Sequence, residues 1–438
     1  MSLDLENLRA MVGTCASVRR VGRICDIRQS TIQIRGGDAD WRLGDRIRLM
    51  SQPFLSGEIV SLHPGGATAL TDGLPEGSAI GDGVERLERS GIAPHDSWIG
   101  RIVDPFGAPL DGRPIVTGPE ERPIVAAPPP ATERKRLGER LETGTAIFNT
   151  FLPIVRGQRI GLFSGSGVGK SSLLGTLARG VSADICVIAL IGERGREVRE
   201  FTESTLGTDG LARSVVVTAT ADRSPLVRRR CAWAAMAIAE YFRDRGLHVL
   251  FLADSVTRFA EAHREIAQAA GEPPTVRGFP GSTAQQIMAL AERAGPGREG
   301  SGDITAILSV LVAASDMDEP IADILRGVLD GHVVMEREIA ERGRYPAINL
   351  LRSVSRSLPG AASDAENALL AEARRLLAAY DKAELMVQSG LYARGSDPIV
   401  DAAIRIWPAL EDFLAESEDR DAAASFERLR QILVRAGR

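Results

Sequence analysis

The stretch Ser164-Gly165-Ser166-Gly167-Val168-Gly169-Lys170-Ser171-Ser172 decides the fold of the central part of this chain. It follows the apolar run 159–163 and precedes the helical pattern 173–179, and strand, glycine-rich turn and helix form the context of a phosphate-binding loop. Glycines let backbone N–H groups converge on a triphosphate, because no Cβ blocks the approach, and the helix N-terminus adds partial positive charge. The strict pattern has glycine where this chain has Ser164. We predict that residues 164–172 bind ATP.

The metal side of this site is predicted from two motifs. Lys170 can reach the β- and γ-phosphates, and the Ser171 hydroxyl is placed to ligate Mg²⁺. Residues 248–254 read as a buried strand that ends in Asp254, the place where a second nucleotide-site motif holds Mg²⁺ through water or through Ser171. An aspartate after a strand is often only a helix cap, but the upstream loop favours the metal role. The predicted cofactors are ATP and Mg²⁺.

A charged segment follows the second core strand. Hydrolysis of a γ-phosphate needs a group that orients water for in-line attack, and Glu193, at a strand end beside the loop, is the best candidate. Arg194 is counted with Glu193 among the catalytic residues. From spacing alone, a solvated turn in which Glu193, Arg194, Arg196 and Glu197 merely pair with one another is almost equally well supported.

Changes in pattern along the chain predict five segments. Short β-branched runs at close spacing favour a small β-barrel, and strands alternating with helices favour a mostly parallel sheet covered on both faces. The predicted core strands are 159–163, 185–191, 214–218, 248–253 and 304–312. The segments are a short N-terminal segment (1–14), a β-barrel domain (15–90), a turn-rich linker that packs on the core (91–143), an α/β P-loop domain (144–360) and a helical C-terminal domain (361–438).

Composition narrows the functional classes. The 438 residues carry a formal net charge of −5, which argues against a general nucleic-acid binder, since such proteins are usually basic. The apolar stretch 304–314 is too short to cross a bilayer, and the first six residues lack the features of a signal peptide. The four cysteines and five histidines show no metal-ligand spacing. We therefore expect a cytoplasmic protein.

Several further motifs carry a resemblance to a known family. They are Leu152-Pro153-Ile154 with residues 156–163, Gly192-Glu193-Arg194-Gly195-Arg196-Glu197, Tyr345-Pro346-Ala347-Ile348 and Ser353-Val354-Ser355-Arg356. Together they resemble the hexameric rotary ATPases, which include the catalytic subunits of ATP synthases and the ATPases of type III secretion. The chain most resembles the flagellar protein-export ATPases, on residues 165–171, 254–260, 264–267, 271–274, 320–323, 329–334 and 395–398.

The resemblance implies a RecA-like core and roles for individual residues. Glu193 matches the glutamate that polarises the attacking water, Arg356 the arginine that a neighbouring subunit inserts, and Tyr345 the aromatic that stacks on adenine. Export ATPases also lack glycine at the position of Ser164. Two places depart from the family pattern: residues 131–138, and the triplet 228–230, whose three arginines are interpreted as a solvated helix face or a subunit contact.

The resemblance also implies partners. They are further copies of the chain in a homohexamer, a stator-like regulatory protein, a membrane export gate, and export substrates with their chaperones. Membrane association would be peripheral, at the cytoplasmic face of the inner membrane, and residues 1–14 are either the docking site for the regulatory protein or a plain solvated terminus. Four alternatives stay open: a virulence type III secretion ATPase, an ATP-synthase catalytic subunit, an RNA-translocating hexameric helicase and a non-catalytic nucleotide-binding subunit.

Overall fold

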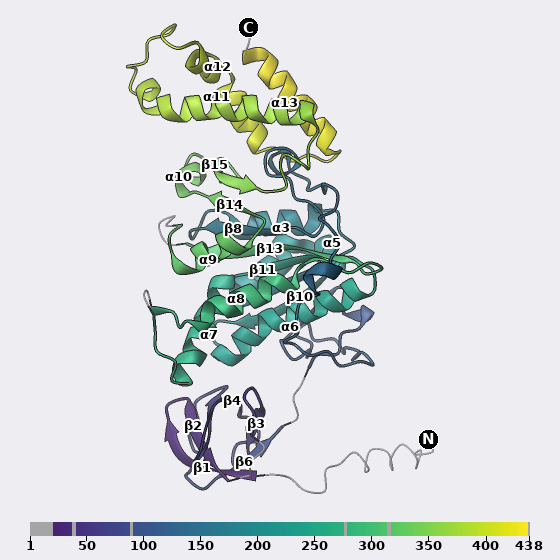
Figure 1. The fold of residues 1–438 in the computed structure, drawn as a ribbon, viewed down its shortest axis with the longest axis vertical. Coiled ribbons are helices and arrows are strands. Elements are labelled where there is room, and N and C mark those ends of the chain that lie inside the picture. Colours follow the sequence, from purple (N-terminus) through teal and green to yellow (C-terminus); the bar gives the residue numbers. More distant parts are fainter. Residues whose placement is uncertain (1–20, 37–40, 88–90, 276–277, 313–316, 437–438) are drawn as a thin grey trace. The chain divides into compact units, whose positions relative to one another are not determined.

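The computed structural model describes residues 21–36, 41–87, 91–275, 278–312 and 317–436 (Figure 1). They form two compact units. One contains the described residues up to 87 together with Arg223–Val227 and the described part of Ala262–Pro280, and the other contains the rest. The segment 1–14 lies outside the described residues. The predicted boundaries of the five segments stay a prediction.

A closed six-stranded antiparallel barrel forms most of the first unit. Its strands follow one another in the order β1-β2-β5-β4-β3-β6. Alternate residues point inward, as Ile32 and Ile34 do, because side chains of a strand alternate between its two faces. The predicted barrel is confirmed. Its strands are β1 (Val21–Arg28), β2 (Thr31–Arg35), β3 (Arg46–Leu49), β4 (Ser56–His63), β5 (Gly66–Thr71) and β6 (Gly83–Arg86).

The second unit is built on one mixed sheet with the order β15-β14-β8-β13-β11-β9-β10-β7 and with β12 paired to β13. Its central strands are buried almost throughout, as expected for parallel strands covered on both faces. The predicted parallel-sheet core is confirmed. The strands are β7 (Arg101–Val103), β8 (Arg159–Ser164), β9 (Ile185–Glu193), β10 (Ser214–Thr220), β11 (His248–Asp254), β12 (Gly295–Pro296), β13 (Asp303–Leu311), β14 (Gly331–Met335) and β15 (Ile348–Ser355).

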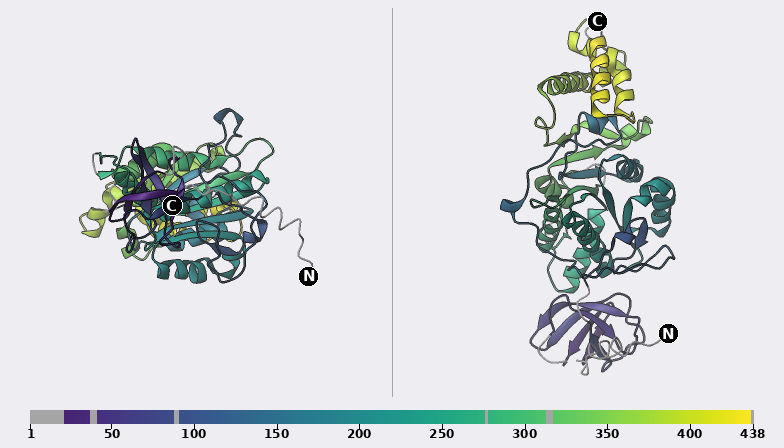
Figure 2. Two further views of the ribbon diagram at one scale, coloured as in Figure 1. Left: turned by 90° about the horizontal axis from the view of Figure 1, so that it is seen from below. Right: turned by 90° about the vertical axis from the view of Figure 1, so that its right-hand side faces the viewer.

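Helices flank this sheet on both sides (Figure 2). Right-handed crossovers between parallel strands account for this, because connections that run in opposite directions along the sheet cover opposite faces. The helices before the C-terminal region are α2 (Ala146–Asn149), α3 (Lys170–Gly180), α4 (Gly195–Glu200), a π-helix (Phe201–Leu206), α5 (Gly207–Ala212), α6 (Pro225–Asp244), α7 (Val256–Ala269), α8 (Ser282–Arg293), α9 (Pro320–Val328) and α10 (Arg337–Glu341), with short 3₁₀ turns at Asp96–Trp98 and Ala131–Glu133.

The region after residue 361 is helical, as predicted. It contains α11 (Asp364–Gln388), α12 (Pro398–Leu414) and α13 (Ala422–Ala436), which group beyond the β15 edge of the sheet (Figure 1). Ser363 begins α11 with a capping box, in which its side chain accepts from the Glu366 N–H and Glu366 accepts from the Ser363 N–H. Tyr380 and Trp407 stack at 3.8 Å between ring centroids and join α11 to α12. No helix within the described ranges is both long and apolar enough to cross a membrane.

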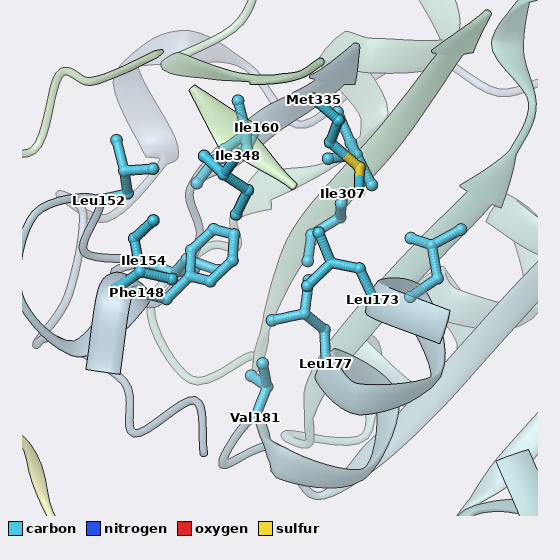
Figure 3. Close-up of a cluster of buried hydrophobic side chains, with 14 of the residues drawn as sticks. Phe148, Leu152, Ile154, Ile160, Leu173, Leu177, Val181, Ile307, Met335 and Ile348 are labelled. Atoms are coloured by element: carbon cyan, nitrogen blue, oxygen red, sulfur yellow. The ribbon is translucent and has the colours of Figure 1, made fainter. Parts of the chain in front are cut away.

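One apolar cluster fixes α3 to the sheet. Leu173 and Leu177 of α3 point toward Ile307 of β13 and Met335 of β14 (Figure 3), and all four side chains are at most 4% exposed. Removing a buried leucine of this kind typically costs about 2–5 kcal/mol. Because α3 begins at Lys170, this packing holds the phosphate-binding loop in place.

Two expectations about local structure differ from the observed fold. The predicted linker contributes a strand, β7, which pairs in parallel with β10, and three residues are too few to give a strand pattern in the sequence. Arg229 and Arg230 are buried rather than solvated: Arg230 donates to the carbonyl of Pro105 at 3.0 Å and lies over the ring of Phe106. The interpretation as a solvated helix face is therefore wrong for these two arginines.

Candidate active site

The glycine-rich turn connects β8 to α3 at the carboxyl edge of the sheet. β8 lies between β14 and β13 and ends at Ser164. Gly167 and Gly169 have φ angles of 79° and 84°, a left-handed conformation that residues with a Cβ rarely adopt. The residues of the turn line a concave surface, and α3 adds its N-terminal charge there. This geometry suits a triphosphate.

An open cleft of about 850 Å³ lies in front of the turn. Residues from the carboxyl ends of several strands border it, where parallel α/β sheets generally bind ligands. The lining contains acidic and basic side chains in similar numbers. The lining residues are Ser164, Gly165, Ser166, Gly167, Gly169, Lys170, Ser171, Ser172, Gly192, Glu193, Arg194, Glu197, Ala221, Arg228, Thr257, Arg258, Glu261, Leu311, Val312 and Glu319.

Lys170 stands between two carboxylates. Its Nζ donates a hydrogen bond to Oδ1 of Asp254 and lies 4.0 Å from Oε1 of Glu193. Ser309 of β13 also donates to Oδ1 of Asp254, at 2.7 Å. The three charged side chains are 12%, 4% and 19% exposed for Lys170, Asp254 and Glu193, so they interact with little screening by water. The structure thus brings together three of the residues predicted from separate motifs.

Glu193 occupies the end of β9 and faces this cluster. Burial, followed by the nearby charge of Asp254, raises the pKa of the Glu193 carboxyl to about 7, although Lys170 acts in the opposite direction. A carboxyl group with a pKa near neutrality is suited to proton transfer. Arg194, in contrast, is 77% exposed and pairs with Glu197 at 3.5 Å. Glu193 therefore interacts with the loop lysine, whereas its neighbour belongs to the solvated turn.

The oxygen ligands at the cleft fit a hard divalent cation. Mg²⁺ in nucleotide sites is typically held by one or two protein oxygens together with substrate phosphates and water, and Asp254 and Ser171 supply a carboxylate and a hydroxyl at the same edge. Within the described part of the chain, no group of three or more His, Cys, Asp or Glu side chains could hold a metal ion by itself.

Tyr345 lies against the turn. A Cβ placed on Gly169 would be 3.1 Å from Cδ1 of Tyr345, so the ring covers the loop at the point where α3 begins. Half of the tyrosine surface is exposed. An aromatic ring that is open on one face beside a phosphate-binding loop can stack on a purine base.

Arg356 is not brought to this cleft. It directly follows β15, which runs antiparallel to β14: Ile348 pairs with Met335, and Ser355 pairs with Gly331. Met335 in turn pairs with Ser164, so the start of β15 lies near the loop. The end of β15 lies at the other end of the strands, beside the start of β8. The five residue steps from Arg159 to Ser164 span about 17 Å, farther than an arginine side chain extends. Arg356 therefore does not reach the loop of its own subunit.

Several residues of the site were not predicted. They include Arg228, Arg258 and Glu261, which line the cleft, and Ser309, which donates a hydrogen bond to Asp254. The only sequence signal for Ser309 is a hydroxyl within an otherwise apolar strand, and this signal gains meaning only once β13 is known to lie between β8 and β11.

The chain is similar to known proteins over most of its length. Residues 144–355 match the nucleotide-binding domain of the ATP synthase alpha/beta family, and residues 362–434 match the C-terminal domain of the T3SS EscN ATPase. The chain is 46% identical over 417 residues to a flagellum-specific ATP synthase of Caulobacter vibrioides, which covers 93% of both proteins. It is 47% identical over 336 residues to a type 3 secretion system ATPase of Xanthomonas euvesicatoria, 77% of this chain and 75% of that protein.

A solved structure shares the whole architecture. The assembled ATPase EscN from the type III secretion system of enteropathogenic E. coli superimposes with a TM-score of 0.86 at 36% identity, over 94% of this chain and 100% of that one. EscN in complex with its central stalk EscO gives a TM-score of 0.85. The similarity therefore extends over barrel, sheet and C-terminal helices.

Proposed function

We propose that this chain, a member of the ATP synthase alpha/beta family, hydrolyses ATP for the flagellar type III export apparatus. Within that family it belongs to the group of flagellum-specific and type 3 secretion ATPases. The observation that carries the proposal is the convergence of Lys170, Glu193 and Asp254 in front of the glycine-rich turn. A subunit that only binds nucleotide has no use for a half-buried carboxyl group at the position of Glu193.

Different residues of the cleft have different roles in ATP binding and hydrolysis. The backbone N–H groups of residues 164–172 and the Lys170 ammonium bind the phosphates, and the ring of Tyr345 stacks on the base. Ser171 and Asp254 would hold Mg²⁺, which would supply positive charge beside the phosphate oxygens. Nζ of Lys170 donates a hydrogen bond to Asp254, so the phosphates of a nucleotide compete with this carboxylate for the lysine.

Glu193 orients the attacking water and accepts its proton. A carboxylate performs this role best when its pKa lies near the working pH, and the pKa of about 7 meets that condition. Arg194 takes a secondary part, since its exposed side chain at the cleft entrance adds positive charge near the phosphates. An arginine of another subunit adds further positive charge that stabilises the transition state.

The site is thus completed by a second copy of the chain. Arg356 lies at the end of β15 that is remote from the loop of its own subunit, and its exposed side chain is available to a neighbouring subunit. We place the chain in a homohexameric ring at the cytoplasmic face of the inner membrane, bound peripherally. Its proposed partners are a stator-like regulatory protein, the membrane export gate, and export substrates with their chaperones. EscN in complex with its central stalk EscO supports a partner of the regulatory kind.

A second candidate function is virulence type III secretion. The 47% identity to the Xanthomonas euvesicatoria ATPase favours it, because this value equals or exceeds the identities to several flagellum-specific relatives. The greater coverage by the Caulobacter vibrioides relative, 93% of each protein, favours the flagellar function.

Replacement of the chromosomal gene by its Glu193→Gln variant in the host bacterium distinguishes these functions. We expect flagellar filament proteins to disappear from the culture medium and swimming to stop, and a wild-type copy should restore both. Normal filaments together with loss of another secreted set of proteins would transfer the function to virulence secretion. Normal export of both sets would contradict the proposal.

A further inference from the structure

Gln158 is a fully buried amide that the proposed chemistry does not use. It directly precedes β8 and is 0% exposed. Its Nε2 donates to the carbonyl oxygen of Asp330 and to Oγ of Ser355, both at 3.1 Å, while its Oε1 accepts from the Val155 N–H at 2.9 Å. Both amide protons and one oxygen lone pair are thus satisfied, so the orientation of the side chain is fixed.

The same carbonyl group of Asp330 holds the backbone of Arg356. Its oxygen accepts the Arg356 N–H at 3.0 Å, in addition to the amide of Gln158. The Asp330 carboxylate accepts from the backbone N–H of Arg159 at 3.0 Å and from its Nε at 3.1 Å. Asp330 is therefore fixed on two sides by the residues that begin β8, and Arg356 is attached to this fixed carbonyl.

Ser355 supplies a second attachment. Its hydroxyl donates to the carbonyl of Pro153 at 2.7 Å and accepts from Gln158. The residue immediately before Arg356 is thus also bound to the segment that leads into β8. In contrast, the guanidinium of Arg356 is exposed and donates to the carbonyl of Arg326 at 3.2 Å, near the end of α9. The backbone is rigidly held and the charged group faces outward.

We propose that Gln158 is a positioning residue for Arg356. It holds the backbone of Arg356 in the position and orientation from which the arginine side chain enters the nucleotide site of the neighbouring subunit. The inference rests on the proposed function, because it takes Arg356 to act across a subunit boundary. The inference predicts an effect that is unusual for a buried residue. Because six residue steps, about 20 Å of strand, separate Gln158 from the loop of its own subunit, its loss should damage the neighbour's site and spare its own.

Gln158→Glu tests this with little change of shape. One carboxyl oxygen can still accept from Val155, but a carboxyl group offers at most one proton where the amide offers two, so the hydrogen bonds to Asp330 and Ser355 cannot both be kept. We expect kcat to fall by up to about 100-fold with KM for ATP almost unchanged, because small displacements of a catalytic group act on the transition state more than on binding. Nucleotide binding and ring size, measured on the same samples, report whether the variant folds and assembles.

Rings mixed from two variants separate positioning from a general structural effect. In rings mixed with Lys170→Ala subunits, the intact loop of a Gln158→Glu subunit can face the correctly positioned Arg356 of a Lys170→Ala subunit. With equal mixing this pairing occurs at about a quarter of the interfaces, so activity should return there. With Arg356→Ala subunits, every loop meets either a displaced arginine or none, so activity should stay low. The pair Lys170→Ala with Arg356→Ala tests action across the boundary by itself.

Thr305→Val is the matched control. Thr305 accepts from the Gly157 N–H at 2.9 Å and lies 2.8 Å from His248, but no hydrogen bond joins it to Asp330, Ser355 or Arg356. It removes buried hydrogen bonds one residue away from Gln158, and we expect nearly normal turnover. If Thr305→Val gave the same loss and the same mixing pattern, general loosening of this edge would explain both, and the inference would be overturned.

The outcomes distinguish the two proposals. If the pair Lys170→Ala with Arg356→Ala does not recover in rings that contain both, the role of Arg356 across the boundary fails, and the inference fails with it. If that pair recovers but Gln158→Glu behaves alike with both partners, only the inference fails. Ser355→Ala, which removes one acceptor of the Gln158 amide, should show the same asymmetry. It decides the question if Gln158→Glu does not assemble, and equal recovery with both partners would overturn the inference.

Discussion

Tyr345 and Arg356 flank a single strand, β15, and lie beyond its opposite ends. The ring of Tyr345 covers Gly169 of the phosphate-binding loop, whereas Arg356 follows Ser355, whose partner Gly331 begins β14. Ten residues, 346–355, thus separate the ring that we propose to stack on the subunit's own nucleotide from a charged group that is too far away to reach this nucleotide. In a ring, one rigid strand would serve two neighbouring sites.

Lys170→Ala should abolish ATP hydrolysis and strongly weaken binding of ATP. The substitution removes the positive charge beside the β- and γ-phosphates, and it also leaves Asp254 without its ammonium partner in a buried place. Turnover of the purified variant, together with equilibrium binding of a fluorescent ATP analogue, checks this. Near-normal turnover would contradict the assignment of the loop.

Glu193→Gln should bind ATP with Mg²⁺ but hydrolyse it about 10²–10⁴-fold more slowly. The amide keeps the shape of the side chain but cannot take up the proton of the attacking water. Single-turnover measurements with the nucleotide already bound separate this effect from binding. Parallel loss of affinity would instead indicate that Glu193 only supports the turn.

The same variant should reveal the raised pKa of Glu193. Between its ordinary pKa of 4.5 and about 7, the folded protein keeps a proton that the unfolded chain releases, so this carboxyl group stabilises the fold less as the pH rises through that window. The variant does not titrate there. Its melting temperature relative to wild type, without nucleotide, should therefore be higher at about pH 8 than at about pH 4.5. A constant difference would mean that Glu193 titrates normally.

Tyr345→Ala should weaken ATP binding, whereas Tyr345→Phe should bind nearly as tightly as wild type. Stacking of a base on an aromatic ring is worth about 1–3 kcal/mol, and it needs the ring rather than the hydroxyl. The affinities of ATP and of inorganic triphosphate can be compared for each variant. An equal loss for both ligands in Tyr345→Ala would show that the ring only supports Gly169.

Much of the fold was predictable because its signals are local. The loop of residues 164–172, the apolar strand before Asp254 and the short runs of the barrel each carry a pattern within a few residues. Strands β7 and β15 were not predicted, because β7 has three residues and β15 exposes several of its side chains. The burial of Arg230 depends on Pro105 and Phe106, more than a hundred residues away.

Some features of the site could likewise be predicted from local motifs, whereas others depend on the fold. Lys170 and Asp254 were predictable as motifs, but the pairing of Asp254 with Ser309 depends on the order of strands in the sheet. The interaction of Glu193 with Lys170, rather than with Arg194, likewise required the fold, since charge spacing supported both readings. Because β15 pairs antiparallel with β14, Arg356 lies at the end of the strands opposite the loop. No local sequence pattern encodes the direction of β15.

Arg356→Ala should lower kcat by about 10³–10⁵-fold while ATP still binds, because an arginine supplied from a neighbour acts on the charge of the transition state. Arg356→Lys should recover only part of the loss, since a lysine keeps the charge but lacks the planar fork of donors. If each site needs two chains, the specific activity of the wild-type protein must also rise with protein concentration as rings assemble. Turnover and sedimentation measured over the same dilution series check this. Full activity in a sample that sediments as monomers would show that the arginine of another subunit is not needed, and that Arg356 serves the fold alone.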